Sequence, residues 1–271
     1  MCFGHVPGHA ALAALASVAM TVAVLATAFP DVEAAAQAVP DRSRSYLFGV
    51  DEDYAPFSYR DERTGKLTGF DAEIVRALCA DMRLRCELVG APFQDILPRV
   101  AEGALDVGAT GYGITEARLE LVDFTEKYFR STTTFIQFGT SFSDVSPESL
   151  RGRRIAVQKD TIQAEYATSR YGALAAISVF EEFGGVVAAL RAGDCDLGLV
   201  DGLPAFAFVR SDEGEGFDVA GDPLPLETEA RMIVNKKLPT LTAGINAAIQ
   251  RIRQNGVYDE INRRYFSFSV Y

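Results

Sequence analysis

The chain has 271 residues, of which 48% are hydrophobic and 23% are charged. This composition, with no low-complexity tract, predicts one large globular domain or two of ordinary size and excludes a disordered protein. The net charge of −11 argues against a nucleic-acid partner, because phosphates are bound by clustered Lys and Arg side chains.

The first 38 residues predict a secretion signal peptide. Residues 10–28 are almost entirely Ala, Val, Leu and Met, and Ala36-Gln37-Ala38 has the small-x-small pattern of a cleavage site. Cleavage there releases the mature protein into an extracytoplasmic space. The apolar run is also long enough to act as an uncleaved anchor, and no Lys or Arg precedes it.

Both histidines of the chain, His5 and His9, lie in this segment. A processed chain therefore lacks His-based acid–base catalysis, the common Ser and Cys triads and most zinc sites. We expect no catalytic residue, no metal site and no cofactor.

After the signal, the chain predicts a βαβαβ unit, which is the beginning of an open parallel sheet. The first helix begins at Asp71, a predicted N-cap, and a second helix ends at Gly103. The expected strands are residues 46–50, 86–89 and 106–109, and the second helix is residues 94–102.

The second half of the chain repeats this plan. Its expected strands are residues 154–157, 177–180 and 196–200, and its expected helices are residues 161–169 and 185–191. Residues 131–137 and 230–234 are expected to cross between the halves, and helical stretches at 241–255 and 258–265 to pack back on the first. Two crossings predict two discontinuous lobes, residues 46–132 plus 229–271 and residues 137–226, each with its own mostly parallel sheet flanked by helices.

One local pattern occurs in both halves, at residues 100–111 and 190–201. In each copy a helix stops at Gly, an Asp opens a strand, and a second Gly interrupts that strand. Arg118 follows the first copy by seven residues, and the second copy ends on Asp201. A guanidinium on one lobe and a carboxylate on the other can together hold a zwitterion, which is the form of a free α-amino acid.

The cysteines allow one disulfide in an oxidising compartment, between Cys79 and Cys86. Seven residues of continuous helix would separate them by about 10 Å, so the chain must turn between them. A redox role of the CxxC type is the alternative, and its spacing does not match. Cys195 is expected to be a small buried residue.

Four motifs of the chain resemble the periplasmic solute-binding proteins that supply polar amino acids to ATP-driven importers. These are Asp-Glu-Asp-Tyr-Ala-Pro-Phe-Ser at 51–58, Gly-Phe-Asp at 69–71, Ile-Thr-Glu-Ala-Arg at 114–118 and Val-Asp-Phe-Thr-Glu-Lys-Tyr at 122–128. The cysteine pair and the last seven residues resemble the branch that binds histidine, lysine, arginine and ornithine.

The resemblance implies an α/β type II periplasmic binding protein fold, whose two lobes close over one ligand by hinge bending. It also implies a periplasmic monomer that captures a polar L-amino acid, with basic amino acids among the candidates, or a derivative, and delivers it to the membrane permease of an ABC importer.

By the same resemblance, Arg118 holds the ligand's α-carboxylate through a bidentate pair, Asp201 accepts from its α-ammonium, and Asp51 faces its side chain. Seven more residues are expected to contact the ligand, as aromatic walls, as a cradle after the third strand, or from the start of a second-lobe helix: Tyr54, Phe93, Thr110, Gly111, Gly113, Thr161 and Gln163.

Departures from the branch leave the ligand open. Gly111 and Gly113 stand where the branch has hydroxyl residues, and Asp160 and Ile162 stand in a segment that usually carries Gly, Ser and Thr. Backbone N–H groups at Gly111 and Gly113 can still bind a carboxylate, and the lost side-chain volume can admit a bulkier ligand.

Each main candidate also has a simpler structural interpretation. Arg118 could form a surface ion pair with a neighbouring Glu, Asp201 could cap a turn, Asp51 could be a turn residue, and Tyr54 and Phe93 could be core aromatics. For the whole protein, the main alternative is an enzyme, because periplasmic cyclohexadienyl dehydratases resemble the same family and bind a carboxylate through an equivalent arginine. A receptor sensor module is a third interpretation, which a retained N-terminal anchor would support.

Overall fold

The computed structural model describes residues 1, 40–139 and 141–271, so the predicted signal peptide lies outside the described residues. The described residues from Pro40 onward belong to one compact unit. No helix in the described ranges combines the length and the apolar character that crossing a membrane requires.

The first lobe is built on three parallel strands, in the order β5-β1-β6. The strands are β1 (Ser45–Asp51), β5 (Arg85–Ala91) and β6 (Val107–Tyr112). Around them lie helices α1 (Phe70–Met82), α2 (Phe93–Glu102), α3 (Glu116–Leu121), α7 (Pro239–Gln254) and α8 (Val257–Tyr265). A separate three-stranded sheet follows β1, from β2 (Asp53–Tyr54), β3 (Ser58–Arg60) and β4 (Leu67–Thr68).

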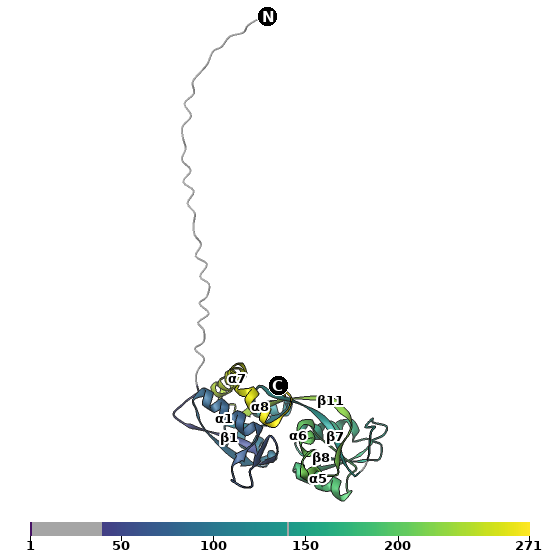
Figure 1. Ribbon diagram of the computed structural model, residues 1–271. Helices are drawn as coiled ribbons and strands as arrows, with labels where there is room; N and C mark the ends of the chain where they lie inside the picture. The colour runs from purple at the N-terminus through teal and green to yellow at the C-terminus, as the bar shows by residue number, and fades with distance from the viewer. Residues whose placement is uncertain (2–39, 140) are drawn as a thin grey trace. The chain divides into compact units, whose positions relative to one another are not determined.

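The second lobe repeats three parallel strands, in the order β10-β8-β9. The strands are β8 (Arg154–Gln158), β9 (Ala176–Phe180) and β10 (Leu197–Asp201). Its helices are α4 (Ile162–Tyr171), α5 (Phe183–Ala192) and α6 (Gly202–Phe208), followed by a 3₁₀ turn at Asp212–Gly214. Figure 1 shows α5, α6 and β8 gathered in this lobe and α1, α7 and α8 in the other.

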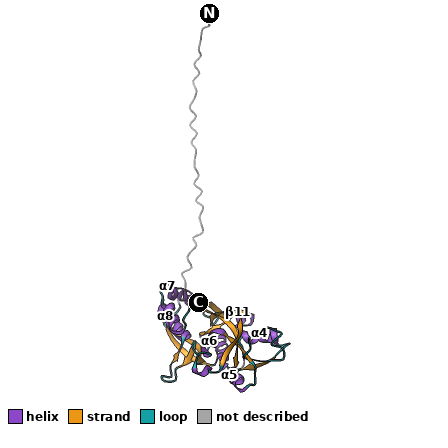
Figure 2. Cartoon of the chain, turned by 45° about the vertical axis from the view of Figure 1, so that its right-hand side comes forward, coloured by secondary structure: helices purple, strands orange, loops and turns teal. Residues whose placement is uncertain are grey.

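Two long strands connect the lobes, β7 (Asp123–Phe138) and β11 (Phe217–Val234). They pair antiparallel with each other; β11 also pairs with β6 of the first lobe, and β7 with β10 of the second. The hydrogen-bonded ladder therefore runs through eight strands, β5-β1-β6-β11-β7-β10-β8-β9, which Figure 2 shows in orange. The expectation of a separate sheet in each lobe is wrong in this respect, because the crossing strands stay paired as they pass between the lobes.

The two lobes nevertheless have separate cores. Phe48 and Phe70 belong to one buried cluster of the first lobe, and Ile96 to another on the opposite face of the sheet. Phe135 and Ile136 belong to two clusters of the second lobe. The pairing of β7 with β11 shifts register on both sides of Leu224 and again on both sides of Arg231, so the ladder between the crossing strands is irregular. The exact lobe limits given above stay a prediction.

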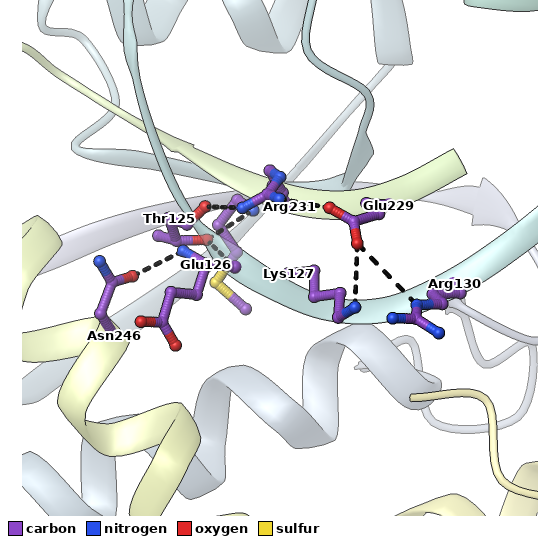
Figure 3. A network of polar contacts seen from close by, with 8 residues as sticks. Thr125, Glu126, Lys127, Arg130, Glu229, Arg231 and Asn246 are labelled. Atoms are coloured by element: carbon purple, nitrogen blue, oxygen red, sulfur yellow. Dashed lines mark hydrogen bonds and ion pairs between the residues drawn. The ribbon is translucent and has the colours of Figure 1, made fainter. Parts of the chain in front are cut away.

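Charged side chains join the crossing strands where they enter the first lobe, as Figure 3 shows. Glu229 accepts from Lys127 at 2.9 Å and from Arg231 at 2.5 Å, and Arg231 also donates to the Thr125 carbonyl at 2.9 Å. Glu229 is nearly half exposed, so each of these ion pairs contributes at most about 1 kcal/mol.

The predicted disulfide between Cys79 and Cys86 is present, with the two Cα atoms 6.2 Å apart. Helix α1 ends at Met82, and Arg83 takes a left-handed conformation, with a φ of 56°, that turns the chain into β5. Cys195 is a free and buried thiol. Both cysteine predictions are confirmed.

The predicted N-cap of α1 is wrong. Gly69 occupies that position with a φ of 111°, and a Cβ atom there would lie 2.4 Å from the Phe57 carbonyl oxygen. Asp71 lies instead inside the first turn, where it is 1% exposed and its Oδ1 accepts a hydrogen bond of 2.8 Å from the Tyr128 hydroxyl.

Candidate ligand-binding site

A cavity between the lobes, with an empty volume of about 560 Å³ that includes its mouth, brings together all ten predicted ligand-binding residues. The first lobe contributes Asp51, Tyr54, Phe93, Thr110, Gly111, Gly113 and Arg118, and the second contributes Thr161, Gln163 and Asp201.

The topology explains why these residues meet. Asp51 is the last residue of β1, Thr110 and Gly111 lie near the end of β6, and Asp201 is the last residue of β10. Open α/β sheets place their crevices at the carboxyl ends of parallel strands. Each lobe presents that edge to the cavity.

Arg118 is 8% exposed and sits in the first turns of α3, whose N-cap Thr115 accepts from its backbone N–H. Its guanidinium donates to the carbonyl oxygens of Gly113 at 2.8 Å and of Asp160, in the other lobe, at 2.5 Å. No ion pair joins it to a carboxylate among the described residues, so the surface ion-pair interpretation does not hold. Burial lowers the pKa of Arg118, and a buried unpaired guanidinium favours an anionic ligand.

Asp201 combines a structural and a candidate binding role. Its Oδ1 accepts from the Leu203 N–H at 3.2 Å and from the Ser131 hydroxyl. Asp201 is therefore the N-cap of α6, in agreement with the alternative that it caps a turn. Both bonds use the same oxygen, which leaves Oδ2 for another donor. Burial raises the pKa of Asp201 to about 6.

Asp51 also combines both roles. It is 7% exposed, lines the cavity, and accepts from the Asp53 N–H at 3.1 Å as a turn residue would. Burial is the main cause that raises the pKa of Asp51 to about 7.

The two predicted aromatic walls line the cavity and pack against other rings. The ring centroids of Tyr54 and of Phe183 in the second lobe are 6.5 Å apart in an edge-to-face arrangement. The rings of Phe93 and Tyr112 are stacked, with their centroids 5.1 Å apart. Aromatic packing and cavity lining are therefore both correct descriptions of these residues.

The expectation that the backbone N–H of Gly111 is free to bind a ligand carboxylate is wrong, because this N–H donates to the Tyr128 hydroxyl at 2.9 Å. Neither glycine leaves extra room for ligand. A Cβ on Gly111 would lie 2.8 Å from the Phe129 ring, and one on Gly113 would lie 3.3 Å from the Ile162 side chain. Larger neighbours fill the space, so the idea that the glycines admit a bulkier ligand is corrected.

The start of α4 faces the same end of the cavity as Arg118. Thr161 caps the helix by accepting from the Ala164 N–H at 3.1 Å, and its own hydroxyl donates to Gln158. Gln163 lies in the first turn and donates to Thr133 at 3.2 Å. The N-terminus of a helix favours an anion, so this end of the cavity suits a carboxylate.

The cavity also has lining residues that the sequence did not single out as ligand contacts: Phe57, Asp71, Tyr112, Phe129, Gln158, Ile162, Pro204 and Thr228. Phe57 and Asp71 belong to the motifs of the family resemblance, which was a usable signal. Thr228 had no such signal in the sequence, because it reaches the cavity through the pairing of β11 with β7. Of the residues described, no group of His, Cys, Asp or Glu is arranged to hold a metal ion.

Two α/β lobes that share a strand-end cavity and are joined by two crossing strands define a solute-binding protein architecture. The chain belongs to the bacterial extracellular solute-binding proteins, family 3, whose family model matches residues 46–268. The predicted family and its basic amino-acid branch are thereby supported by sequence as well as by fold.

Three known proteins illustrate the similarity. The L-arginine-binding protein of Pseudomonas aeruginosa is 31% identical over 234 residues, covering 82% of this chain and 88% of the relative. The structure of the arginine-, lysine-, histidine-binding protein ArtJ from Geobacillus stearothermophilus matches with a TM-score of 0.77 at 25% identity, covering 83% of this chain and 96% of that one. The ancestral amino acid-binding protein AncCDT-1, a precursor of cyclohexadienyl dehydratase, matches with a TM-score of 0.72 at 25% identity, covering 82% and 95%.

Proposed function

We propose that this protein captures a free α-amino acid in the periplasm and presents it to the membrane permease of an ABC importer. The observation that carries the proposal is the placement of Arg118 and Asp201 on opposite lobes of one cavity. Arg118 would take the α-carboxylate, aided by the start of α4, and Asp201 would take the α-ammonium. The amino-acid ligands named for the relatives agree with this assignment.

Capture would work by closure of the lobes. Arg118 already contacts the second lobe through the Asp160 carbonyl, and Tyr54 contacts it through Phe183. A ligand that touches both lobes stabilises the closed arrangement because it makes its full set of contacts only there. The protein is proposed to act as a monomer without a cofactor.

A dehydratase on the same fold is the competing proposal. It needs a buried acid that stays protonated near neutral pH. Burial raises the pKa of Asp201 toward that range, but only to about 6, which leaves the group mostly ionised at pH 7. The carrier is favoured because the first relatives are binding proteins and Asp201 is placed to receive an ammonium. Incubation with prephenate and with arogenate, followed by detection of the aromatic product, decides between them: turnover would support the enzyme.

The direct test is calorimetric titration of protein that has been unfolded and refolded to remove carried-over ligand. The panel comprises L-arginine, L-lysine, L-ornithine, L-histidine, L-citrulline and L-glutamine. Saturable one-to-one binding of at least one of them supports the proposal. Failure of all six, with a normally cooperative unfolding transition, would contradict it.

A further inference from the structure

The hydroxyl of Ser131 holds one oxygen of Asp201 from a strand that connects the lobes. Ser131 is 4% exposed, lies in β7, and is not among the residues that line the cavity. Its Oγ donates to the Asp201 Oδ1 and accepts from the Leu203 N–H at 3.1 Å. In the described part of the chain, Ser131 is the one side chain that donates a hydrogen bond to Asp201. Any effect of Ser131 on a ligand therefore passes through this carboxylate.

The backbone around Asp201 is packed directly on β7. Asp201 pairs with Thr133 in the antiparallel ladder of β10 and β7. The next residue, Gly202, approaches β7 so closely that a Cβ atom on it would lie 2.4 Å from the Thr132 Oγ1 and 3.1 Å from the Thr132 carbonyl oxygen. Ser131 follows in the same stretch, where β7 pairs with β11. The position of Asp201 is thus set by a crossing strand as well as by its own lobe.

The hydrogen bond from Ser131 also opposes the effect of burial on the Asp201 carboxyl. Burial raises the pKa of Asp201 to about 6, and the hydrogen bonds from Ser131 and Leu203 lower it. The other titratable groups among the described residues that line the cavity are two acids, two phenols and one guanidinium: Asp51, Asp71, Tyr54, Tyr112 and Arg118. The guanidinium is bonded to backbone carbonyl oxygens, and the acids and phenols carry no positive charge. The Ser131 hydroxyl is therefore the side chain that favours the ionised form of Asp201.

Both hydrogen bonds that Asp201 accepts within the described chain end on Oδ1. A carboxylate that is fixed at one oxygen presents the other oxygen in a defined place, and it loses little conformational freedom when a ligand donor arrives. Hydrogen bonds between an ammonium and an ionised carboxylate are stronger than those between neutral groups. Orientation and ionisation of Asp201 thus both favour an ammonium at Oδ2.

We propose that Ser131 is a positioning residue for ligand binding, which orients Asp201 from the crossing strand and keeps Oδ2 available for the α-ammonium of the ligand. The proposal rests on the amino-acid carrier function and on the assignment of the ammonium to Asp201. It applies to an α-amino acid with any side chain, because the α-ammonium is common to all of them.

The test compares L-arginine with 5-guanidinopentanoic acid, which is arginine without its α-ammonium. In calorimetric titrations at neutral pH we expect the wild-type protein to prefer arginine. Ser131→Ala should reduce this preference at least about fivefold, the scale expected for a hydrogen bond to a charged group. A variant that only loosened the fold would lose affinity for both compounds equally. An unchanged preference in Ser131→Ala would overturn the proposal.

The pH dependence of binding is the second readout. Without the hydroxyl, the pKa of Asp201 should rise, because the bond from Ser131 lowers it in the wild type. On acidification from pH 8.5 to pH 5, the affinity of Ser131→Ala for L-arginine should therefore begin to fall at a higher pH than that of the wild type. Asp51 and Asp71 titrate in both proteins, so the difference between the two profiles reports on Asp201. Profiles of the same shape would contradict the proposal.

Thr125→Val is the matched control. Thr125 is a buried hydroxyl residue of the same strand, which accepts from the Met232 N–H of the other crossing strand at 3.0 Å and does not line the cavity. This variant should unfold more easily while keeping the preference for arginine and the wild-type pH profile. A change in the control as large as in Ser131→Ala would show a general effect of the crossing strands and would also overturn the proposal.

A measurement on the ligand-free wild-type protein applies even if Ser131→Ala fails to fold. In ¹³C NMR titrations the Asp201 carboxyl should ionise at a lower pH than the Asp71 carboxyl, because the pKa of Asp71 is raised to about 8 by burial. An Asp201 carboxyl that ionises at the same pH as Asp71, or above it, would contradict the proposal.

The outcomes separate this inference from the carrier function. If the wild type binds L-glutamine and not L-arginine, the comparison uses glutaramic acid, which is glutamine without its α-ammonium. If the wild type prefers the amino acid and Ser131→Ala keeps the full preference, the carrier function stands and this inference falls. If the wild type binds no amino acid, both fall.

Discussion

At the scale of single residues, the site is dominated by acids that burial makes weaker. The pKa values of Asp201, Asp51 and Asp71 are raised to about 6, about 7 and about 8, and burial is the largest cause for each. All three residues line the cavity. A cationic ligand favours their ionised forms, so its binding should be linked to the release of protons.

This linkage predicts how stability depends on pH. An acid whose pKa is raised by folding stabilises the protein below its unfolded pKa, and this contribution is lost as pH rises through the folded pKa. The ligand-free protein should therefore have a lower melting temperature at pH 8.5 than at pH 5. Asp61 and Asp196, whose pKa values hydrogen bonds lower, are already ionised throughout this window.

A bound cationic amino acid should reduce this loss, because it stabilises the ionised carboxylates. Melting curves with and without L-arginine, from pH 5 to pH 8.5, provide the measurement. The matched variant Asp71→Asn should show a shallower decline in the ligand-free state. A ligand-free melting temperature that rises with pH over this range would show that these acids do not titrate as described.

The residue types of the site could be predicted from the sequence, but their hydrogen bonds could not. Arg118 and Asp201 stand at defined offsets from a repeated pattern, and strand ends converge in an open sheet. The use of the Gly111 N–H by Tyr128, and the filling of the Gly113 side by Ile162, depend on contacts between distant segments. Whether each lining residue contacts ligand stays a prediction.

At the scale of elements, the local order of strands and helices follows the sequence closely, because periodicity and Gly or Asp at the ends are local signals. The continuous eight-stranded ladder could not be predicted in this way, because residues of β7 pair with residues of β11 that follow them by 79 (Phe138 with Phe217) to 111 positions (Asp123 with Val234). Hydrophobic pattern indicates that both segments are strands. It contains no information on how far their pairing continues between the lobes.

The turn between α1 and β5 supports a stability prediction. Replacing both Cys79 and Cys86 by Ser opens a loop of about eight residues and should lower the free energy of unfolding by about 2.5 kcal/mol. The disulfide does not line the cavity, so ligand affinity should change less than about threefold. Denaturant unfolding and calorimetry measure the two effects, and a large loss of affinity without a loss of stability would contradict this separation of roles.

At the scale of the whole molecule, each lobe has its own hydrophobic core clusters, and the two lobes are connected by the paired strands β7 and β11. This arrangement predicts that the lobes move relative to each other by hinge bending. Contacts such as that of Arg118 with Asp160 must break when the lobes open. Small-angle scattering should therefore show a more compact particle with L-arginine than without, at the mass of a monomer. An identical scattering profile at saturating ligand would argue against closure.

The central claim is that Arg118 binds the α-carboxylate of an amino acid between the lobes. Its most direct test is the titration of wild-type protein and of Arg118→Ala with L-arginine and with agmatine, which is arginine without its carboxylate. Loss of a buried charged partner costs about 2–5 kcal/mol, or roughly 30-fold to several-thousand-fold in affinity. We expect the wild type to bind arginine more tightly than agmatine by a factor in this range, and folded Arg118→Ala to bind the two about equally. Equal binding of arginine and agmatine by the wild type, or undiminished arginine binding by Arg118→Ala, would contradict the account.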